Sequence, residues 1–379
     1  MNTNTGPGPL GGNNTMKSPA EVLKPREVPP PPKRSKGAKG NMIVVLNFMM
    51  TCVVLATIAL CILAYLGKYW FEKPGPLQAS TTLLIEEGSS VDRITNKLVN
   101  NGVIDNGLIF KAWVRAHRAQ GSLKAGEYLF GARMSMYDVM ETIRSGKGIL
   151  HKVSVPEGLT VVQIFERIAK NEVLEGDLPA EMPAEGALMP DTYPFQRGTT
   201  RKDLVERMKG AQEKFLEEVW GRRIDGLPIN SKEEMVILAS IVEKETGKAD
   251  ERPRVASVFI NRLRRGMKLQ SDPTIIYGIF GGEGKPKGRP IYKSDIETPT
   301  PYNTYTIPAL PPGPIANPGR AALEAVANPS RTDDLFFVAN GTGGHSFAKT
   351  LDEHNRNVAR WRAIEAQQKK DAAAAASSD

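Results

Sequence analysis

Cysteine is nearly absent from this chain of 379 residues, and its two cysteines, Cys52 and Cys61, both lie in one long apolar run. On a helix, their separation in the sequence places them ~13 Å apart along the axis, which is too far for a disulfide between them. Residues 67–379 contain no cysteine. Disulfide cross-links are therefore excluded from that part of the chain, and packing alone must stabilise it.

Histidine is also scarce, with four residues in the chain. His345 and His354 have Asp352 and Glu353 nearby, but the spacing fits no standard zinc signature, so we predict no metal site and no cofactor. The sequence has neither a Gly-x-Ser-x-Gly motif, which marks one class of serine hydrolase, nor a phosphate-binding loop. It also lacks a basic stripe interleaved with aromatic residues in its folded part, which argues against nucleic-acid binding.

Charge is missing from residues 42–66. As a helix this run would reach ~37 Å, enough to cross the ~30 Å core of a bilayer, and it is longer than the apolar region of a cleaved signal peptide. Seven lysines and arginines precede the run, against two glutamates, so the positive-inside rule predicts a cytoplasmic N-terminus and residues 67–379 on the outer side. Tyr69, Trp70 and Phe71 are then expected at the outer membrane–water interface.

The predicted fold class is α+β, with a single N-terminal transmembrane helix, a LysM-like α/β subdomain and a mixed, helix-rich catalytic domain. Residues 1–41 are rich in Gly, Pro, Asn and Ser and are predicted to be disordered. The other predicted segments are the transmembrane helix 42–66, a linker 67–80, the LysM-like subdomain 81–185, the catalytic domain 186–366 and a disordered tail 367–379.

The LysM-like subdomain contains an internal repeat, because residues 85–104 and 155–174 align without a gap at an offset of 70 residues. Each copy predicts a short β segment, a glycine turn, a Ser or Thr N-cap and a helix. Between the copies we expect a helix at 108–118, a strand at 126–129 and a helix at 135–144. The strand–turn–helix unit resembles LysM-type modules, which bind the N-acetylglucosamine-containing glycan of cell walls. A module that only positions the next domain is an equal alternative.

The catalytic domain contains a mostly apolar helix, ILASIVEKET at 237–246, with two carboxylates near its end, Glu243 and Glu245. Burying a carboxylate costs free energy and raises its pKa, which is what a general acid at neutral pH requires. Geometry alone does not choose between the two glutamates. Either could instead be an ordinary helix-end carboxylate paired with Lys244 or Arg252.

The surroundings of this helix favour an active site. Small residues beside Glu243 on the helical wheel, such as Ser240, would leave room for a ligand. A second helix is predicted at about 251–265. Polar residues set among turn-formers fill the segments 270–278, 298–305, 309–319 and 341–355.

In their sequence and order these segments resemble the endolytic murein transglycosylases, the YceG-like or MltG family. The matching motifs are ASIVEKET at 239–246, ASVFINRL at 256–263, QSDPTIIYG at 270–278, TPYNTY at 300–305, LPPGPIANPG at 310–319, and NGTGGHSF with TLDEHN at 340–355. The similarity extends from about Leu83 to about Trp361 and includes the Asp-Thr-Tyr segment at 191–193. The chief departures are Ser271 and the Pro-rich tail before the membrane helix.

The resemblance implies an enzyme that cleaves the β-1,4 bond between N-acetylmuramic acid and N-acetylglucosamine in peptidoglycan strands. It assigns the general acid to Glu243, which would protonate the glycosidic oxygen and then accept the proton of the C6 hydroxyl of the same muramic residue. That hydroxyl closes on C1 to give a 1,6-anhydro end, so water is not the nucleophile and one carboxylate can suffice. The resemblance also implies the bacterial inner membrane, periplasmic residues 67–379, and termination of nascent strands beside penicillin-binding peptidoglycan synthases.

The side chains expected to bind substrate are Gln270, Asp272, Thr274, Tyr277, Tyr302, Asn303, Tyr305 and His345. Glu245, Asp191 and Tyr193 are expected to support the site, Glu245 as a structural or pKa-tuning partner. Asp272 could equally form an Asx turn, and Tyr302 and Tyr305 could equally belong to the core. Two other functions stay open: a wall-binding scaffold, which would tolerate Glu243→Gln, and a hydrolase that uses water and leaves reducing ends.

Overall fold

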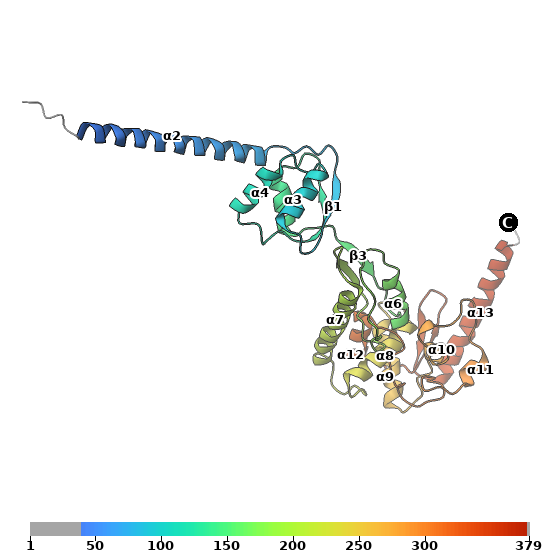
Figure 1. Ribbon diagram of the computed structural model, residues 1–379. Coiled ribbons are helices and arrows are strands. Elements are labelled where there is room, and N and C mark those ends of the chain that lie inside the picture. The colour runs from blue at the N-terminus through green and yellow to red at the C-terminus, as the bar shows by residue number, and fades with distance from the viewer. Residues whose placement is uncertain (1–38, 377–379) are drawn as a thin grey trace, which may run out of the picture. The chain divides into compact units, whose positions relative to one another are not determined.

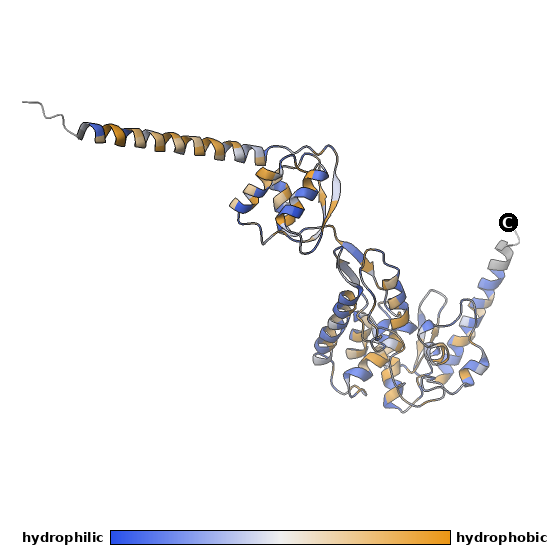
Figure 2. Cartoon of the chain, in the orientation of Figure 1, coloured by the Kyte–Doolittle hydropathy of each residue, from blue (hydrophilic) through white to orange (hydrophobic). Residues whose placement is uncertain are grey.

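The computed structural model describes residues 39–376, in a chain that divides into two compact units, Met1–Lys68 and Tyr69–Asp379 (Figure 1). Its first helix, α2, runs from Lys39 to Glu72 and is apolar and exposed along most of its length (Figure 2). The stretch Gly40–Glu72 is long and apolar enough to cross a membrane, with a mean hydropathy of 2.5. The predicted disordered segment 1–41 lies outside the described residues, except for residues 39–41, which are helical.

Helix α2 is longer than the charge-free run and takes up the start of the predicted linker. Tyr69 and Trp70 are exposed, but Phe71 is 1% exposed and its ring stacks on Trp113 with the centroids 5.5 Å apart. The prediction that Phe71 lies at the membrane–water interface is therefore wrong. Its ring is part of a hydrophobic core, because burying an aromatic side chain against Trp113 is worth ~2 kcal/mol.

That core belongs to a first lobe, residues 81–145. Its elements are β1 (Thr81–Ile85), α3 (Val91–Asn100), α4 (Gly107–Ala116), β2 (Gly126–Phe130) and α5 (Met136–Ser145). Strands β1 and β2 pair antiparallel, with Thr81 opposite Phe130. Side chains from all five elements fill the core, among them Ile85, Leu98, Phe110, Tyr128 and Ile143. The elements predicted between the two copies of the repeat are confirmed.

The second copy of the repeat builds a separate core. Its elements are β3 (His151–Ser154) and α6 (Val161–Ala169), joined by β4 (Thr192–Phe195) and α7 (Arg201–Gly221). Both copies have a glycine at positive φ in the turn, Gly88 at 70° and Gly158 at 76°, and a side-chain N-cap, Ser90 and Thr160. Strand β3 pairs with β4, and the shared core extends from Val153 to Met208. The predicted boundary at 185/186 therefore runs through this core, which joins 151–185 to the chain that follows.

The remaining elements form the largest core. They are α8 (Lys232–Glu245), α9 (Arg252–Arg264), α10 (Asp272–Phe280), the short 3-10 turn η1 (Gly281–Glu283), α11 (Lys293–Glu297), α12 (Arg320–Ala327), β5 (Phe336–Ala339), β6 (His345–Ala348) and α13 (Leu351–Ala376). Helix α8 is buried on all sides from Met235 to Val242 and packs on α9 and α12, where alanines allow close approach (Figure 1). Helix α13 continues to Ala376, into the segment 367–379 that the sequence predicts to be disordered.

These elements make a mixed α+β, helix-rich fold in which each described sheet has two strands. The two helices predicted around the carboxylates are confirmed as α8 and α9. Ser231 caps α8 by accepting a hydrogen bond from the Glu234 amide, as its sequence predicts. The cap fixes the start of α8, and core packing fixes its length. The last turn of α8, which contains Glu243, is therefore held in place.

Candidate active site

Glu243 lies in the last turn of α8, where the helix stops because Thr246 turns the backbone to an extended conformation. Its side chain is 5% exposed. Its Oε2 accepts a hydrogen bond of 2.9 Å from the amide of Gly319, and its Oε1 lies 3.5 Å from Nη2 of Arg252. The helix end, the loop before α12 and the start of α9 therefore meet at this carboxyl.

Burial of the Glu243 carboxyl favours its protonated form. Burial raises the pKa of Glu243 above the ordinary carboxyl value of 4.5, and the negative charge of Glu157 raises it further. The Gly319 amide, Arg252 and Lys244 pull the pKa of Glu243 in the opposite direction without cancelling the rise. A carboxyl that keeps its proton toward neutral pH can act as a general acid.

The loop before α12 is fixed by buried polar side chains. Ser240, with no exposed surface, accepts a 3.0 Å hydrogen bond from the amide of Ile315. Asn317 is equally buried; its amide nitrogen donates to the Leu159 carbonyl and to Glu185, over 3.0 and 2.8 Å. The expectation that Ser240 leaves room for a ligand is therefore wrong, because the small side chain makes room for this loop instead.

Glu245 faces a different part of the protein. Its Oε1 accepts a 2.6 Å hydrogen bond from the hydroxyl of Ser271, the residue just before α10. Burial raises the pKa of Glu245 to about 7, with Asp272 raising it and Ser271 and Arg262 lowering it. The two glutamates, which helical geometry alone could not distinguish in the sequence, have different surroundings in the structure. Glu243 contacts the loop before α12 and the start of α9, whereas Glu245 binds the residue before α10.

Four of the predicted substrate-binding residues lie where a ligand could reach them. Tyr277 and Tyr302 pack ring to ring with centroids 4.9 Å apart, and Tyr277 lines a cleft of about 340 Å³ whose wall also includes Lys244. Asp272 is exposed and accepts a 2.7 Å hydrogen bond from the hydroxyl of Tyr305. Aromatic faces and exposed polar pairs are suited to sugar rings.

Three others are held inside the protein or by its loops. Thr274 and Asn303 have no exposed surface. The Thr274 hydroxyl donates to the Ser271 carbonyl, and the Asn303 amide donates to two backbone carbonyls. Gln270 is exposed at a φ of 51°, and its side-chain oxygen accepts from Arg262 over 3.2 Å. These contacts favour a structural role for Thr274 and Asn303.

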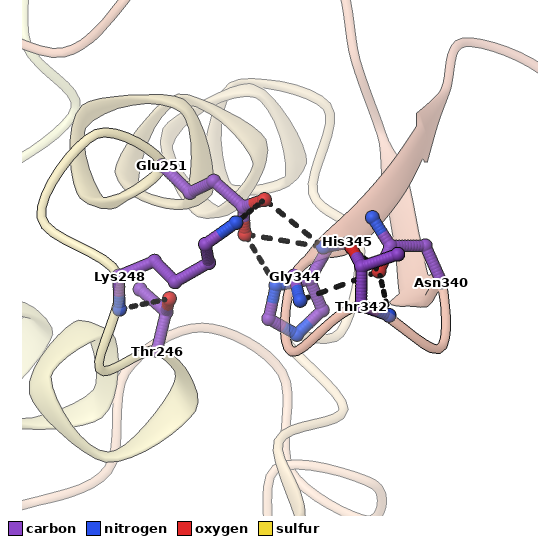
Figure 3. Close-up of polar contacts among 7 residues, drawn as sticks. All are labelled: Thr246, Lys248, Glu251, Asn340, Thr342, Gly344 and His345. Atoms are coloured by element: carbon purple, nitrogen blue, oxygen red, sulfur yellow. Dashed lines mark hydrogen bonds and ion pairs between the residues drawn. The ribbon is translucent and has the colours of Figure 1, made fainter.

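His345, at the start of β6, is paired with Glu251 just before α9 (Figure 3). The ring Nδ1 lies 2.9 Å from a Glu251 oxygen, and the His345 amide donates to the same carboxylate over 3.1 Å. Figure 3 shows the Asn340–Gly344 turn folded beside this pair, with Asn340 accepting from the Thr342 and Gly344 amides. The pair ties the β5–β6 turn to α9, next to Arg252.

The predicted supporting pair, Asp191 and Tyr193, divides between the surface and the core. Tyr193 is buried, its hydroxyl donates to the Met189 carbonyl over 2.8 Å, and burial raises the pKa of Tyr193 to about 12. Asp191 is exposed and lies 3.9 Å from Arg320. Both of these charged residues line a cleft of about 290 Å³ that also contains Glu157.

A metal site finds no support in residues 39–376, which contain no cluster of three or more His, Cys, Asp or Glu side chains arranged around one point. His345 is engaged by Glu251, and His354 stacks on Phe336 with centroids 5.1 Å apart.

Comparison with known proteins identifies the family of this chain. The sequence profile of the YceG-like family matches residues 83–360, which include every site residue described above. The chain belongs to the YceG-like family. An endolytic murein transglycosylase of Bacillus subtilis is 33% identical over 314 residues, which cover 74% of this chain and 84% of that protein.

The chain is also similar to a pneumococcal protein and to a protein of known structure. An endolytic murein transglycosylase of Streptococcus pneumoniae serotype 2 is 30% identical over 350 residues, which cover 78% of this chain and 62% of that protein, so the chain spans less than two thirds of the pneumococcal relative. A yceG-like protein from Listeria monocytogenes, whose crystal structure is known, is 30% identical to this chain. The structural alignment covers 73% of this chain and 98% of the Listeria chain, with a TM-score of 0.45.

Sequence reasoning about this YceG-like chain did not single out Glu157, Glu185 or Gly319. Glu157 lies in the second copy of the repeat, and Gly319 lies in the LPPGPIANPG loop. A glutamate or a glycine in these motifs does not predict a contact with a helix that is distant in the sequence. Glu185 is a buried carboxylate that accepts hydrogen bonds from Val161 and Asn317, and burial raises the pKa of Glu185. Only the folded structure brings Glu157 and Gly319 to the end of α8, and Glu185 to Asn317 and Tyr277.

Proposed function

We propose that this chain is a membrane-anchored lytic transglycosylase that cuts within peptidoglycan strands, with Glu243 as its general acid. The observation that carries the proposal is the buried Glu243 carboxyl, which lies between the Gly319 amide and Arg252 and has a raised pKa. The family relatives named endolytic murein transglycosylases support the choice of substrate.

The reaction needs one group that first donates a proton, as a general acid, and then accepts a proton, as a general base. Glu243 gives its proton to the oxygen that links N-acetylmuramic acid to N-acetylglucosamine, and the bond from C1 to that oxygen breaks. The ionised Glu243 then takes the proton of the C6 hydroxyl as that oxygen forms a bond to C1 of the same sugar. The products are a 1,6-anhydromuramic end and a free N-acetylglucosamine end, and the enzyme returns to its starting protonation state.

An enzyme that cuts inside a strand must hold sugars on both sides of the scissile bond, and two clefts flank Glu243. The cleft of about 340 Å³ includes Lys244, the next residue in α8. The cleft of about 290 Å³ includes Arg320, which follows Gly319. We therefore place the strand across both clefts, with the tyrosine pair Tyr277 and Tyr302 supplying an apolar face for a sugar ring.

The rest of the chain fits a tethered enzyme. In this proposal α2 spans the inner membrane with the basic N-terminal segment in the cytoplasm, which places residues 67–379 in the periplasm. The first lobe, with its strand–turn–helix unit, acts as the LysM-like glycan-binding or positioning part. The enzyme would then end nascent strands near the membrane, beside penicillin-binding synthases.

The test compares three forms of the full-length protein in detergent: wild type, Glu243→Gln and Glu245→Gln. Each is incubated with peptidoglycan, and the released fragments are identified by mass spectrometry. We expect anhydromuramic ends from wild type and Glu245→Gln, and a loss of at least ~100-fold for Glu243→Gln because the general acid is gone. Reducing ends would move the assignment to a hydrolase, and glycan binding without any cleavage would favour a scaffold.

A further inference from the structure

Arg252 lies between two carboxylates. It is the first residue of α9 and is 6% exposed, with Nη2 at 3.5 Å from Glu243 Oε1 and 3.9 Å from Glu157 Oε2. Glu157 comes from the turn between β3 and α6, and its carboxylate packs against Gly319 so closely that a Cβ there would fall 1.8 Å from Glu157 Oε1. The turn, the helix and the loop before α12 thus bring two acids and one base together.

The charge of this cluster decides where a proton resides. Two carboxyl groups beside one guanidinium are neutral as a group only when one carboxyl is protonated. The Glu243 side chain is 5% exposed and the Glu157 side chain 43%, so ionising Glu243 costs more. The remaining charged group that faces Glu243 is Lys244, whose ammonium donates to the Gly158 carbonyl over 3.1 Å and whose side chain is exposed.

We propose that Glu157 is a positioning residue of the transglycosylase site, which shares Arg252 with Glu243 and so favours the protonated form of Glu243. The inference rests on the proposed function and adds to it a residue that acts on the reaction through Arg252 and Glu243. After Glu243 has given up its proton, Arg252 is already within reach of the new negative charge.

The geometry shows why Arg252 alone would not do. A buried glutamate paired only with an arginine forms an ion pair and has its pKa lowered by ~1–3 units, which is the wrong direction for an acid catalyst. The separation of 3.5 Å between Arg252 and Glu243 is longer than the ~2.7–2.9 Å of a tight charge-assisted hydrogen bond. Arg252 Nε is also buried, and it has no hydrogen-bond partner among the described residues.

The internal repeat supplies a comparison within the chain. Glu87 occupies the position of Glu157 in the first copy, after the same β segment and before the same glycine turn. Glu87 is exposed on the first lobe. The strand–turn–helix unit itself therefore does not need a glutamate packed against another element, and the placement of Glu157 is specific to the end of α8.

The test is the pH profile of anhydromuramic-end formation by the full-length protein in detergent, measured from acid to alkaline pH. The forms compared are wild type, Glu157→Gln, Glu157→Asp and Arg252→Gln, with Glu166→Gln as a control that removes an exposed α6 carboxylate of the same charge. Because Glu243 must be protonated, its pKa sets the alkaline limb of the profile.

For Glu157→Gln we expect the alkaline limb to move down by about one pH unit, so that cleavage on that limb falls ~10-fold while cleavage at acid pH persists. Glu157→Asp restores part of the shift, Arg252→Gln moves the limb up, and Glu166→Gln leaves it in place. An unmoved limb in Glu157→Gln, whether the rate is normal or uniformly lower, overturns the inference and leaves the proposed function intact. Wild-type protein that forms no anhydro ends at any pH overturns both.

Discussion

Replacing Glu245 with glutamine removes a buried titrating group while keeping its shape and its ability to accept the Ser271 hydroxyl. Burial raises the pKa of Glu245 from 4.5 to about 7. In the folded protein the carboxyl is therefore still protonated at pH values where the unfolded chain has already ionised it. The stability that Glu245 contributes is complete below pH 4.5 and is lost progressively as the pH rises to about 7.

The size of the effect follows from that difference in pKa. At about 1.4 kcal/mol per pKa unit, the free energy of unfolding of the wild type should fall by about 3 kcal/mol relative to Glu245→Gln between pH 4.5 and pH 7.5. Other groups with raised pKa values, such as Glu243 and Glu185, are present in both proteins and cancel in the comparison.

The assay is urea unfolding of the full-length protein in detergent at a series of pH values, followed by tryptophan fluorescence, to which Trp220 beside the largest core contributes. The Glu166→Gln variant serves as the control, because its carboxylate is exposed on α6. Equal pH dependence in wild type and Glu245→Gln would refute the assignment of Glu245 as a buried, protonated group. Loss of cleavage in Glu245→Gln at full stability would refute its structural role.

Two other substitutions test the surroundings of Glu243. Gly319→Ala fits the backbone, whose φ is −77°, but its Cβ would displace the Glu157 carboxylate, so the alkaline limb of the cleavage profile should move down as in Glu157→Gln; a wild-type profile would contradict the arrangement. His345→Ala should lower the free energy of unfolding by ~1 kcal/mol, because Glu251 loses its ring partner, and should retain most of the cleavage rate. Cleavage lost at unchanged stability would instead restore His345 as a substrate contact.

Local features of the fold were readable in the sequence. The repeat, with its glycine turns and the caps Ser90 and Thr160, predicted both strand–turn–helix copies, since these signals act over a few residues. The apolar pattern around Glu243 predicted α8 for the same reason. The predicted boundary at 185/186 lies between strands β3 and β4, which pair with each other, and pairing between distant strands leaves no local signal.

The site was predictable in its outline only. The motifs around Tyr277 and Tyr305 gather near one end of α8, but a motif does not tell which of its side chains face inward: Thr274 and Asn303 have no exposed surface. The choice between Glu243 and Glu245 depends on Gly319, which is far away in sequence and offers only a backbone amide. A sequence pattern reflects the types of side chain, so it does not predict a hydrogen bond from a backbone amide such as that of Gly319.

The central claim is that Glu243 drives an attack by the C6 hydroxyl of the sugar and not by water. The most direct test is cleavage of peptidoglycan by the full-length protein in water labelled with heavy oxygen, with the new ends analysed by mass spectrometry. We predict anhydromuramic ends that carry no label and are lighter by one water than a reducing end. Reducing ends that contain one heavy oxygen atom would contradict the account and make the enzyme a hydrolase.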